Sequence, residues 1–314
     1  VIYTTASRII TANIDTSEWY DSEGGTGTED YVIAREYGDE LYLALEYVKK
    51  YTNFFYEGFT DYNHMQLTTS WEEMEVATVS KDTQVRLRGG VKSEILRQLS
   101  KDEEVVVLEV LENWSKVKTS DAYIGYVENK MLSDAVTRSP IPVTDYVEEE
   151  YTSLVRDHKI NLGFHNVAGA GGNDTLLSSI ENTKSLNVVS PTWYNVASED
   201  GSISSFATAS YVKTAHDKGL EVWALVDNFS GSSDFSTSEF LSRAASRANA
   251  INAIVQEAID LGIDGINIDF EGIASEDGQS FVEFVREFSI ACRKNNLVLS
   301  IDNYVPMNFN DYYD

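Results

Sequence analysis

The stretch DGINIDFE, residues 264–271, decides the fold of this chain and its chemistry. Successive side chains of a β-strand point to opposite faces. If this stretch is a strand, its apolar residues therefore share one face: Ile266, Ile268 and Phe270. Its polar residues share the other face: Asn267, Asp269 and Glu271. A strand with one apolar and one polar face predicts helices on the first side and a polar column on the second.

The surrounding sequence, 158–314, alternates apolar runs with helical patterns. We expect helices over 174–183, 205–219, 238–261 and 279–295, and strands over 160–167, 186–196, 220–229, 263–270 and 297–305. Near-continuous apolar strands separated by helices are typical of parallel βαβ units. This part is predicted to be an α/β barrel of TIM type or a doubly wound sheet.

The polar column indicates acid–base chemistry. Glu271 would lie at the carboxyl end of its strand, where barrel enzymes keep their active sites. Two carboxylates so close repel each other, which raises the pKa of one and lets it hold a proton near neutral pH. No Lys or Arg on this strand neutralises Asp269 or Glu271. A calcium loop or a structural role is an alternative, but the intervening Ile and Phe residues suit a core strand better.

The run LGIDGINIDFEG resembles the signature of glycoside hydrolase family 18, Asp-Gly-x-[Asp/Asn]-x-Asp-x-Glu, at the end of the fourth barrel strand. The resemblance implies a (β/α)8 barrel in which Glu271 protonates the glycosidic oxygen. Asp269 would orient the substrate's 2-acetamido group, which attacks its own anomeric carbon. Many members have Asp where this chain has Asn267, which can hydrogen-bond Asp269 but cannot share a proton. The Asn form resembles the peptidoglycan and spore-cortex N-acetylglucosaminidases.

Further polar and aromatic residues follow the other predicted strands. They are expected to bind substrate together with Asn267, because strand ends are where a sugar cleft finds stacking faces and hydrogen bonds. These residues are Trp193, Tyr194, Asn228, Asn303 and Tyr304. His165 ends the first strand and could face the cleft, whereas Asp264 is interpreted as structural. The four histidines show no ligand spacing, and neither a metal site nor a cofactor is expected.

The N-terminal half is predicted to consist of small β-rich modules. We expect a small mixed α+β module over residues 1–72 and a linker over residues 137–157. Residues 73–136 predict a compact all-β barrel. The run ENWSKVKTSDAYIGYVENKML resembles the bacterial Src-homology-3-like domain, although Ala122 stands where many members have Gly. That resemblance implies a targeting role, with a cell-wall peptide as ligand.

The composition of the chain argues against several classes of protein. A formal net charge of -27 disfavours nucleic-acid binding, and the absence of 18 consecutive apolar residues disfavours a membrane span. The single cysteine, Cys292, allows no intrachain disulfide and is predicted to be buried. The resemblances imply an extracellular or cell-wall-associated protein, although no signal peptide is present in these residues.

Two functions of different class follow. The first is a secreted hydrolase that cleaves β-1,4 bonds next to N-acetylglucosamine in peptidoglycan or chitin. The second is a non-catalytic, lectin-like protein that holds a cell-wall glycan. Only about five of the eight barrel strands are expected in 158–314. We expect this sequence to be a fragment of a longer polypeptide that is inactive alone, with completion by another chain or a natural remnant as the alternatives.

Overall fold

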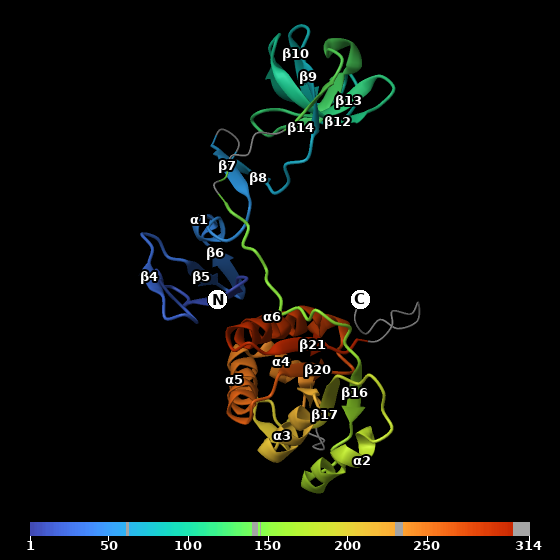
Figure 1. Cartoon of the computed structure of the whole chain (residues 1–314). Helices are drawn as coiled ribbons and strands as arrows, with labels where there is room; N and C mark the ends of the chain where they lie inside the picture. The colour runs from blue at the N-terminus through green and yellow to red at the C-terminus, as the bar shows by residue number, and fades with distance from the viewer. Residues whose placement is uncertain (61–62, 140–143, 145, 230–234, 304–314) are drawn as a thin grey trace. The chain divides into compact units, whose positions relative to one another are not determined.

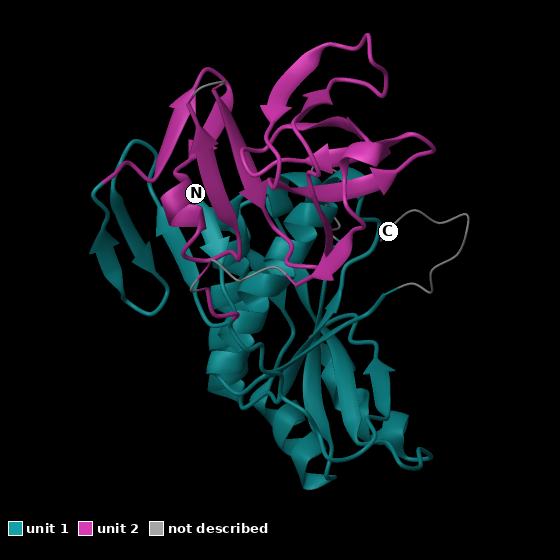
Figure 2. Ribbon diagram, turned by 90° about the horizontal axis from the view of Figure 1, so that it is seen from above, with its two compact units in different colours: residues 1–30, 149–314 teal, residues 31–148 magenta. Residues whose placement is uncertain are grey.

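The computed structural model describes residues 1–60, 63–139, 144, 146–229 and 235–303 (Figure 1). The chain groups into two compact units (Figure 2). Unit 1 combines Val1–Asp30 with Glu149–Asp314, and unit 2 is Tyr31–Glu148. One division therefore falls inside the expected module 1–72, and the other inside the expected linker 137–157.

The expected module 1–72 divides because its strands pair only with sequence neighbours. An antiparallel sheet in unit 1 contains β1 (Ile2–Thr4), β2 (Ile9–Ala12), β3 (Glu18–Asp21) and β4 (Thr26–Thr28). Unit 2 begins with the hairpin β5 (Ala34–Tyr37) and β6 (Glu40–Leu43), helix α1 (Leu45–Val48), and the hairpin β7 (Phe55–Phe59) and β8 (His64–Thr68).

The rest of unit 2 is an antiparallel seven-stranded sheet in the order β11-β10-β14-β13-β12-β9-β15. Its strands are β9 (Met74–Thr78), β10 (Thr83–Arg86), β11 (Ile95–Leu99), β12 (Glu104–Val110), β13 (Trp114–Lys118), β14 (Ile124–Glu128) and β15 (Val136–Arg138). Alternate residues such as Val117 and Val127 are fully buried in one apolar cluster. Ala122, in the turn before β14, has a φ of 65°, a conformation that favours glycine.

The α/β part of unit 1 has five parallel strands in the order β16-β17-β19-β20-β21. They are β16 (Leu162–His165), β17 (Val188–Val196), β19 (Glu221–Asp227), β20 (Gly265–Asp269) and β21 (Val298–Ile301). All five lie inside the ranges predicted for strands. A short unexpected strand, β18 (Ile203–Ser205), pairs antiparallel with β17.

The helices between these strands are α2 (Leu176–Ile180), α3 (Ala209–Asp217), α4 (Thr237–Ser242), α5 (Ala244–Leu261) and α6 (Gly278–Lys294). The helix expected over 238–261 is two helices, because Arg243 adopts an extended conformation between α4 and α5. Gly262 ends α5 with a φ of 71°, which is a common glycine helix terminus.

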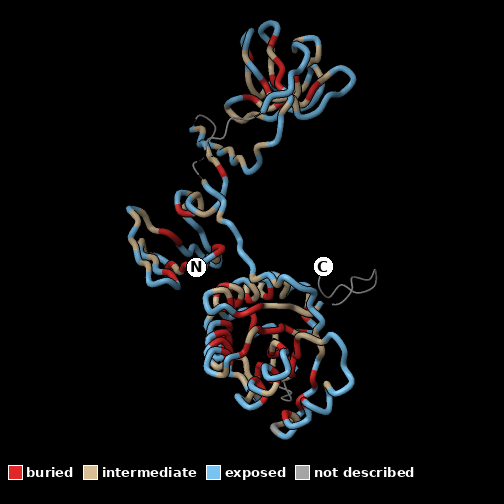
Figure 3. The backbone as a smooth tube through the Cα atoms, viewed as in Figure 1, coloured by how far each residue is buried: buried red, intermediate tan, exposed pale blue. Residues whose placement is uncertain are grey.

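The main hydrophobic core lies between this sheet and its helices (Figure 3). The apolar face of β20 packs into it, since Ile266 and Ile268 are fully buried. On α6, the inward residues repeat at helical spacing and are Phe281, Phe284, Phe288 and Cys292. The burial of Cys292 confirms the prediction made for it. Gly265 is required in β20, because a Cβ there would lie 2.9 Å from the Val298 carbonyl oxygen.

Candidate functional site

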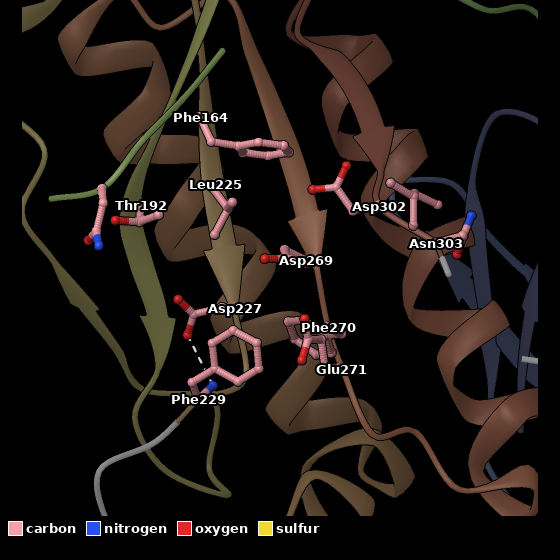
Figure 4. A pocket seen from close by; sticks show the side chains of 12 residues that line it. Phe164, Thr192, Leu225, Asp227, Phe229, Asp269, Phe270, Glu271, Asp302 and Asn303 are labelled. Atoms are coloured by element: carbon pink, nitrogen blue, oxygen red, sulfur yellow. Dashed lines mark hydrogen bonds between the residues drawn. The ribbon is translucent and has the colours of Figure 1, made fainter. Parts of the chain in front are cut away.

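A pocket of about 890 Å³ opens at the carboxyl ends of the parallel strands (Figure 4). We call it the strand-end pocket. It contains four carboxylates but no Lys or Arg among the described residues that line it. Its lining residues are Phe164, Asn166, Thr192, Leu225, Asp227, Phe229, Asp269, Phe270, Glu271, Ile301, Asp302 and Asn303.

Three of the carboxylates follow from the register of neighbouring strands. Asp227 at the end of β19 pairs with Asp269 at the end of β20. Ile268 pairs with Ile301 on β21, and Asp302 comes directly after Ile301, so it lies next to Asp269 on the other side. Register partners in parallel strands point to the same face. The pairing therefore sets Asp227, Asp269 and Asp302 in one row across three strands.

Asp269 is the central member of this row, and its carboxyl group has a perturbed pKa. Burial and the negative charges of Asp302, Glu271 and Asp227, in that order of size, together raise the pKa of Asp269 to about 6. Strand alternation alone predicts such a shift in pKa from one neighbouring carboxylate, whereas burial is its largest cause here. Asp269 therefore exchanges its proton in the mildly acidic range.

Glu271 lies just beyond β20 and is exposed to the pocket. Its backbone is held by the side-chain amide of Asn228. The Asn228 Nδ2 atom donates to the Glu271 carbonyl oxygen at 2.9 Å, and the Glu271 N–H donates to Asn228 Oδ1 at 3.0 Å. Nδ2 also donates to Thr237 Oγ1 at 3.0 Å. Asn228, predicted to bind substrate, is thus buried, and its side chain is hydrogen-bonded to the backbone of Glu271.

Asn267 lies beneath this row and is 1% exposed. Its Nδ2 atom donates to Oδ2 of Asp302 at 2.6 Å, and the Ser300 hydroxyl donates to its Oδ1 atom. Ser300 is the register partner of Asn267 on β21. The described hydrogen bonds of the Asn267 side chain therefore run to the neighbouring strand, whereas the sequence suggested Asp269 as partner.

Trp193 and Tyr194 differ from the expectation that they offer stacking faces to a sugar. Trp193 is 1% exposed and Tyr194 is 0% exposed, and both belong to the main hydrophobic core. The Trp193 indole N–H donates to Asn173 Oδ1 at 2.8 Å. A position near the end of a strand does not determine whether a side chain points into the pocket or into the core. Here both aromatic rings are packed in the core.

His165 also faces away from the strand-end pocket. Its Nδ1 and Nε2 atoms lie 2.8 Å from the Tyr211 hydroxyl and 2.9 Å from Thr175 Oγ1. Burial lowers the pKa of His165. Asp264 accepts the Val222 N–H at 2.8 Å and lies 2.8 Å from His216 Nε2, at the opposite end of β20. The structural interpretation of Asp264 is thereby confirmed.

Asn303 lines the strand-end pocket as expected, and Tyr304 lies outside the described residues. Sequence reasoning missed Asp302, although this residue directly follows the apolar run LSI and so carries the same strand-end signal as Asn303. It also missed two phenylalanines that line the pocket with largely exposed rings, Phe164 at 61% and Phe229 at 52%. Phe164 lies inside the short strand β16 and Phe229 follows β19, and neither was singled out from the sequence.

Within the described ranges, no group of three or more His, Cys, Asp or Glu side chains has an arrangement that could hold a metal ion. None of the helices in that part of the chain combines the length and apolar character needed to cross a lipid bilayer.

Comparison with solved structures finds proteins that are similar to part of the chain. A chitinase from Chromobacterium violaceum is 21% identical over 45% of this chain and 44% of that structure, with a TM-score of 0.38. A spore cortex-lytic enzyme from Bacillus megaterium is 14% identical over 64% of this chain and 49% of that structure, with a TM-score of 0.38. The chain thus spans less than half the length of these structures. No curated protein matches it.

Family models match two segments. The model of the bacterial SH3 domain matches residues 81–133, which contain β10 to β14 of unit 2. The model of the glycosyl hydrolases family 18 matches residues 125–314, well over half of the chain, and includes all five parallel strands and the strand-end pocket. The chain therefore belongs to glycosyl hydrolases family 18 and carries a bacterial SH3 domain.

Proposed function

We propose that this protein is a glycoside hydrolase that cleaves β-1,4 bonds next to N-acetylglucosamine, with the strand-end pocket as its active site. The observation that carries the proposal is the convergence of Asp269 and Glu271 at the carboxyl end of β20 in one pocket. Barrel enzymes keep their chemistry at this end of the strands. The five parallel strands would be the first five of a (β/α)8 barrel.

The reaction would be retaining and substrate-assisted. Glu271 would donate a proton to the glycosidic oxygen as the bond to the anomeric carbon breaks. The carbonyl oxygen of the substrate's own 2-acetamido group would attack that carbon and form a cyclic intermediate. Asp269 would accept the acetamido N–H and stabilise the positive charge. Water would then open the ring, with its proton returning to Glu271.

The pocket walls suit a sugar polymer. Phe164 and Phe229 expose large aromatic faces, and such faces stack on the apolar sides of pyranose rings. Asn303 and Asn166 add hydrogen-bonding groups. Trp193 and Tyr194 are not used in this proposal, because both are buried in the core.

We propose peptidoglycan as the polymer and the bacterial cell wall, outside the cell, as the location. The SH3 domain supports this choice, since domains of this kind often bind cell-wall peptides, and residues 73–136 would have that role here. The Asn at position 267 supports it as well, through the resemblance to peptidoglycan and spore-cortex N-acetylglucosaminidases. Chitin is the competing substrate.

The test is product analysis after incubating purified protein with peptidoglycan and, separately, with N-acetylglucosamine oligomers. We expect new reducing N-acetylglucosamine ends, and a loss of at least about 100-fold in Glu271→Gln, which lacks the acid. Glu276→Gln, a charge-matched change in the exposed turn after Glu271, serves as the control. Turnover that survives Glu271→Gln contradicts the proposal, and tight glycan binding without turnover supports the lectin-like alternative.

A further inference from the structure

The neighbouring carboxylate with the largest effect on Asp269 is Asp302, which follows the adjacent strand β21. We propose that Asp302 is a positioning residue for Asp269, because it supplies beside Asp269 the negative charge that an amide at position 267 cannot carry. The catalytic consequence rests on the proposed function. The pairing of the two carboxyl groups is a property of the fold and can be measured without turnover.

The backbone places Asp302 at this point. The Asp302 N–H donates to the Ile268 carbonyl oxygen at 2.8 Å, which continues the ladder between β20 and β21 by one residue. Asp302 therefore lies beside Asp269 at the same level of the sheet. Figure 4 shows both carboxyl groups directed into the pocket from adjacent strands.

Asn267 orients the Asp302 carboxyl group. Because the Ser300 hydroxyl donates to Asn267 Oδ1, the Nδ2 group of Asn267 is turned toward Asp302, to which it donates at 2.6 Å. These two hydrogen bonds connect Ser300, Asn267 and Asp302 in series. They fix the orientation of the Asp302 carboxyl group, whose charge acts on Asp269.

The other groups around Asp269 do not offset this charge. β19 contributes Asp227, whose Oδ1 atom accepts the Asn195 amide at 2.6 Å and the Phe229 N–H at 3.0 Å. β20 contributes Glu271. The lining residues from β16 and β17 are uncharged, Phe164 and Thr192, and no described Lys or Arg lines the pocket. Of the three neighbouring carboxylates, Asp302 has the largest effect on the pKa of Asp269.

The consequence is that a charge on the neighbouring strand helps to hold the proton on Asp269. The charge of Asp302 keeps the proton on Asp269 to a higher pH than burial alone would. Since the proposed mechanism needs ionised Asp269 to accept the acetamido N–H, Asp302 would set the acid limb of the pH profile. Removing its charge must move that limb to lower pH.

The experiment is a pH titration of the Asp269 carboxyl carbon by NMR in protein labelled with 13C-aspartate, assigned by its loss in Asp269→Asn. Asp302→Asn keeps the size of the side chain and one oxygen that can accept from Asn267 Nδ2, and it removes the charge. We expect the Asp269 midpoint to fall by about one pH unit. Asp260→Asn, which removes the same charge from the exposed side of α5, should leave it in place.

The double variant Asn267→Asp/Asp302→Asn exchanges the amide and the carboxylate within the pair. It should return the midpoint toward the parent value, because a negative charge again adjoins Asp269. An Asp269 titration unmoved by Asp302→Asn overturns the proposal. A midpoint that falls in Asp302→Asn but is not restored by the exchange also overturns it, since the cause would then be local packing.

The pH dependence of turnover completes the test. The acid limb of kcat/KM should follow the Asp269 midpoint in Asp302→Asn, whereas a purely structural role would lower activity at every pH alike. Absent turnover with a responsive titration would refute the proposed function and leave the charge pairing intact. Turnover with an unresponsive titration would refute the role of Asp302 and leave the function intact.

Discussion

The side-chain amide of Asn228 binds both backbone groups of Glu271, donating to its carbonyl oxygen at 2.9 Å and accepting its N–H at 3.0 Å. Asn228 follows β19, and Glu271 follows β20. The clamp therefore joins the ends of two adjacent strands and sets the direction in which the Glu271 carboxyl group leaves the backbone.

Removing this clamp should impair turnover more than binding. We expect Asn228→Ala to lower kcat by about 10-fold or more, because a small displacement of the acid costs alignment. The KM for N-acetylglucosamine oligomers should change less. Steady-state kinetics measures both. The matched variant Thr237→Val removes only the outer hydrogen bond to Asn228 and should have a smaller effect. An unchanged kcat in Asn228→Ala would rule out the clamp as a positioning device.

Asp269 should lower the stability of the folded protein above about pH 6. Its pKa is raised from 3.8 to about 6 by burial and by nearby carboxylates. The folded state binds the proton more tightly than the unfolded state, so stability is lost as pH rises from about 4 through 6. Above that range Asp269→Asn should raise the free energy of unfolding by about 1 kcal/mol, a value reduced for solvent screening.

Urea unfolding of unit 1 at pH 7 and at pH 4 measures this effect. The gain from Asp269→Asn should be large at pH 7 and much smaller at pH 4, where the carboxyl group is protonated in the folded state and about half protonated in the unfolded state. Asp260→Asn should show no such contrast. An equal gain at both pH values would mean that the charge of Asp269 is not the cause.

The ion pair of Arg247 and Glu287 should be the most sensitive polar contact between α5 and α6. Both side chains are at most 7% exposed, and two hydrogen bonds of 2.9 and 2.8 Å join them. Removing one partner leaves a buried charge, so we expect Glu287→Ala to cost about 3–5 kcal/mol. Thermal and urea unfolding measure the loss.

The exposed pair of Lys213 and Asp217 on α3 provides the comparison. Solvent screens such pairs, and Lys213→Ala should cost less than about 1 kcal/mol. Similar losses in the two variants would contradict the assignment of Arg247 and Glu287 as a buried structural pair.

Ala122 is a position where the SH3 domain should gain stability from glycine. Its φ of 65° is strained for an L-residue, at a cost of about 1–2 kcal/mol. Glycine removes that strain but adds freedom to the unfolded chain, so Ala122→Gly should stabilise unit 2 by about 0.5–1 kcal/mol. Ala135→Gly, at an exposed position without a positive φ, should be slightly destabilising. Calorimetry measures the unfolding temperature of both variants. A lower unfolding temperature in Ala122→Gly would contradict the prediction.

Periodicity in the sequence was enough to determine which residues form the parallel strands and which face of β20 is polar. Ile266 and Ile268 enter the core, and Asp269 enters the pocket, because alternation is a local property of an extended chain. The family signature at 264–271 and the SH3-like run near Trp114 were also readable, since each lies in one short segment.

Only the tertiary structure decided which side chains meet. Asp302 adjoins Asp269 through the register of β20 and β21, and Asn267 turns to Asp302 rather than to Asp269. Likewise Asn228 binds Glu271, 43 residues away. Trp193 was expected in the pocket but is buried in the core. Register between strands distant in sequence depends on the packing of the whole core, and a local pattern carries no record of it.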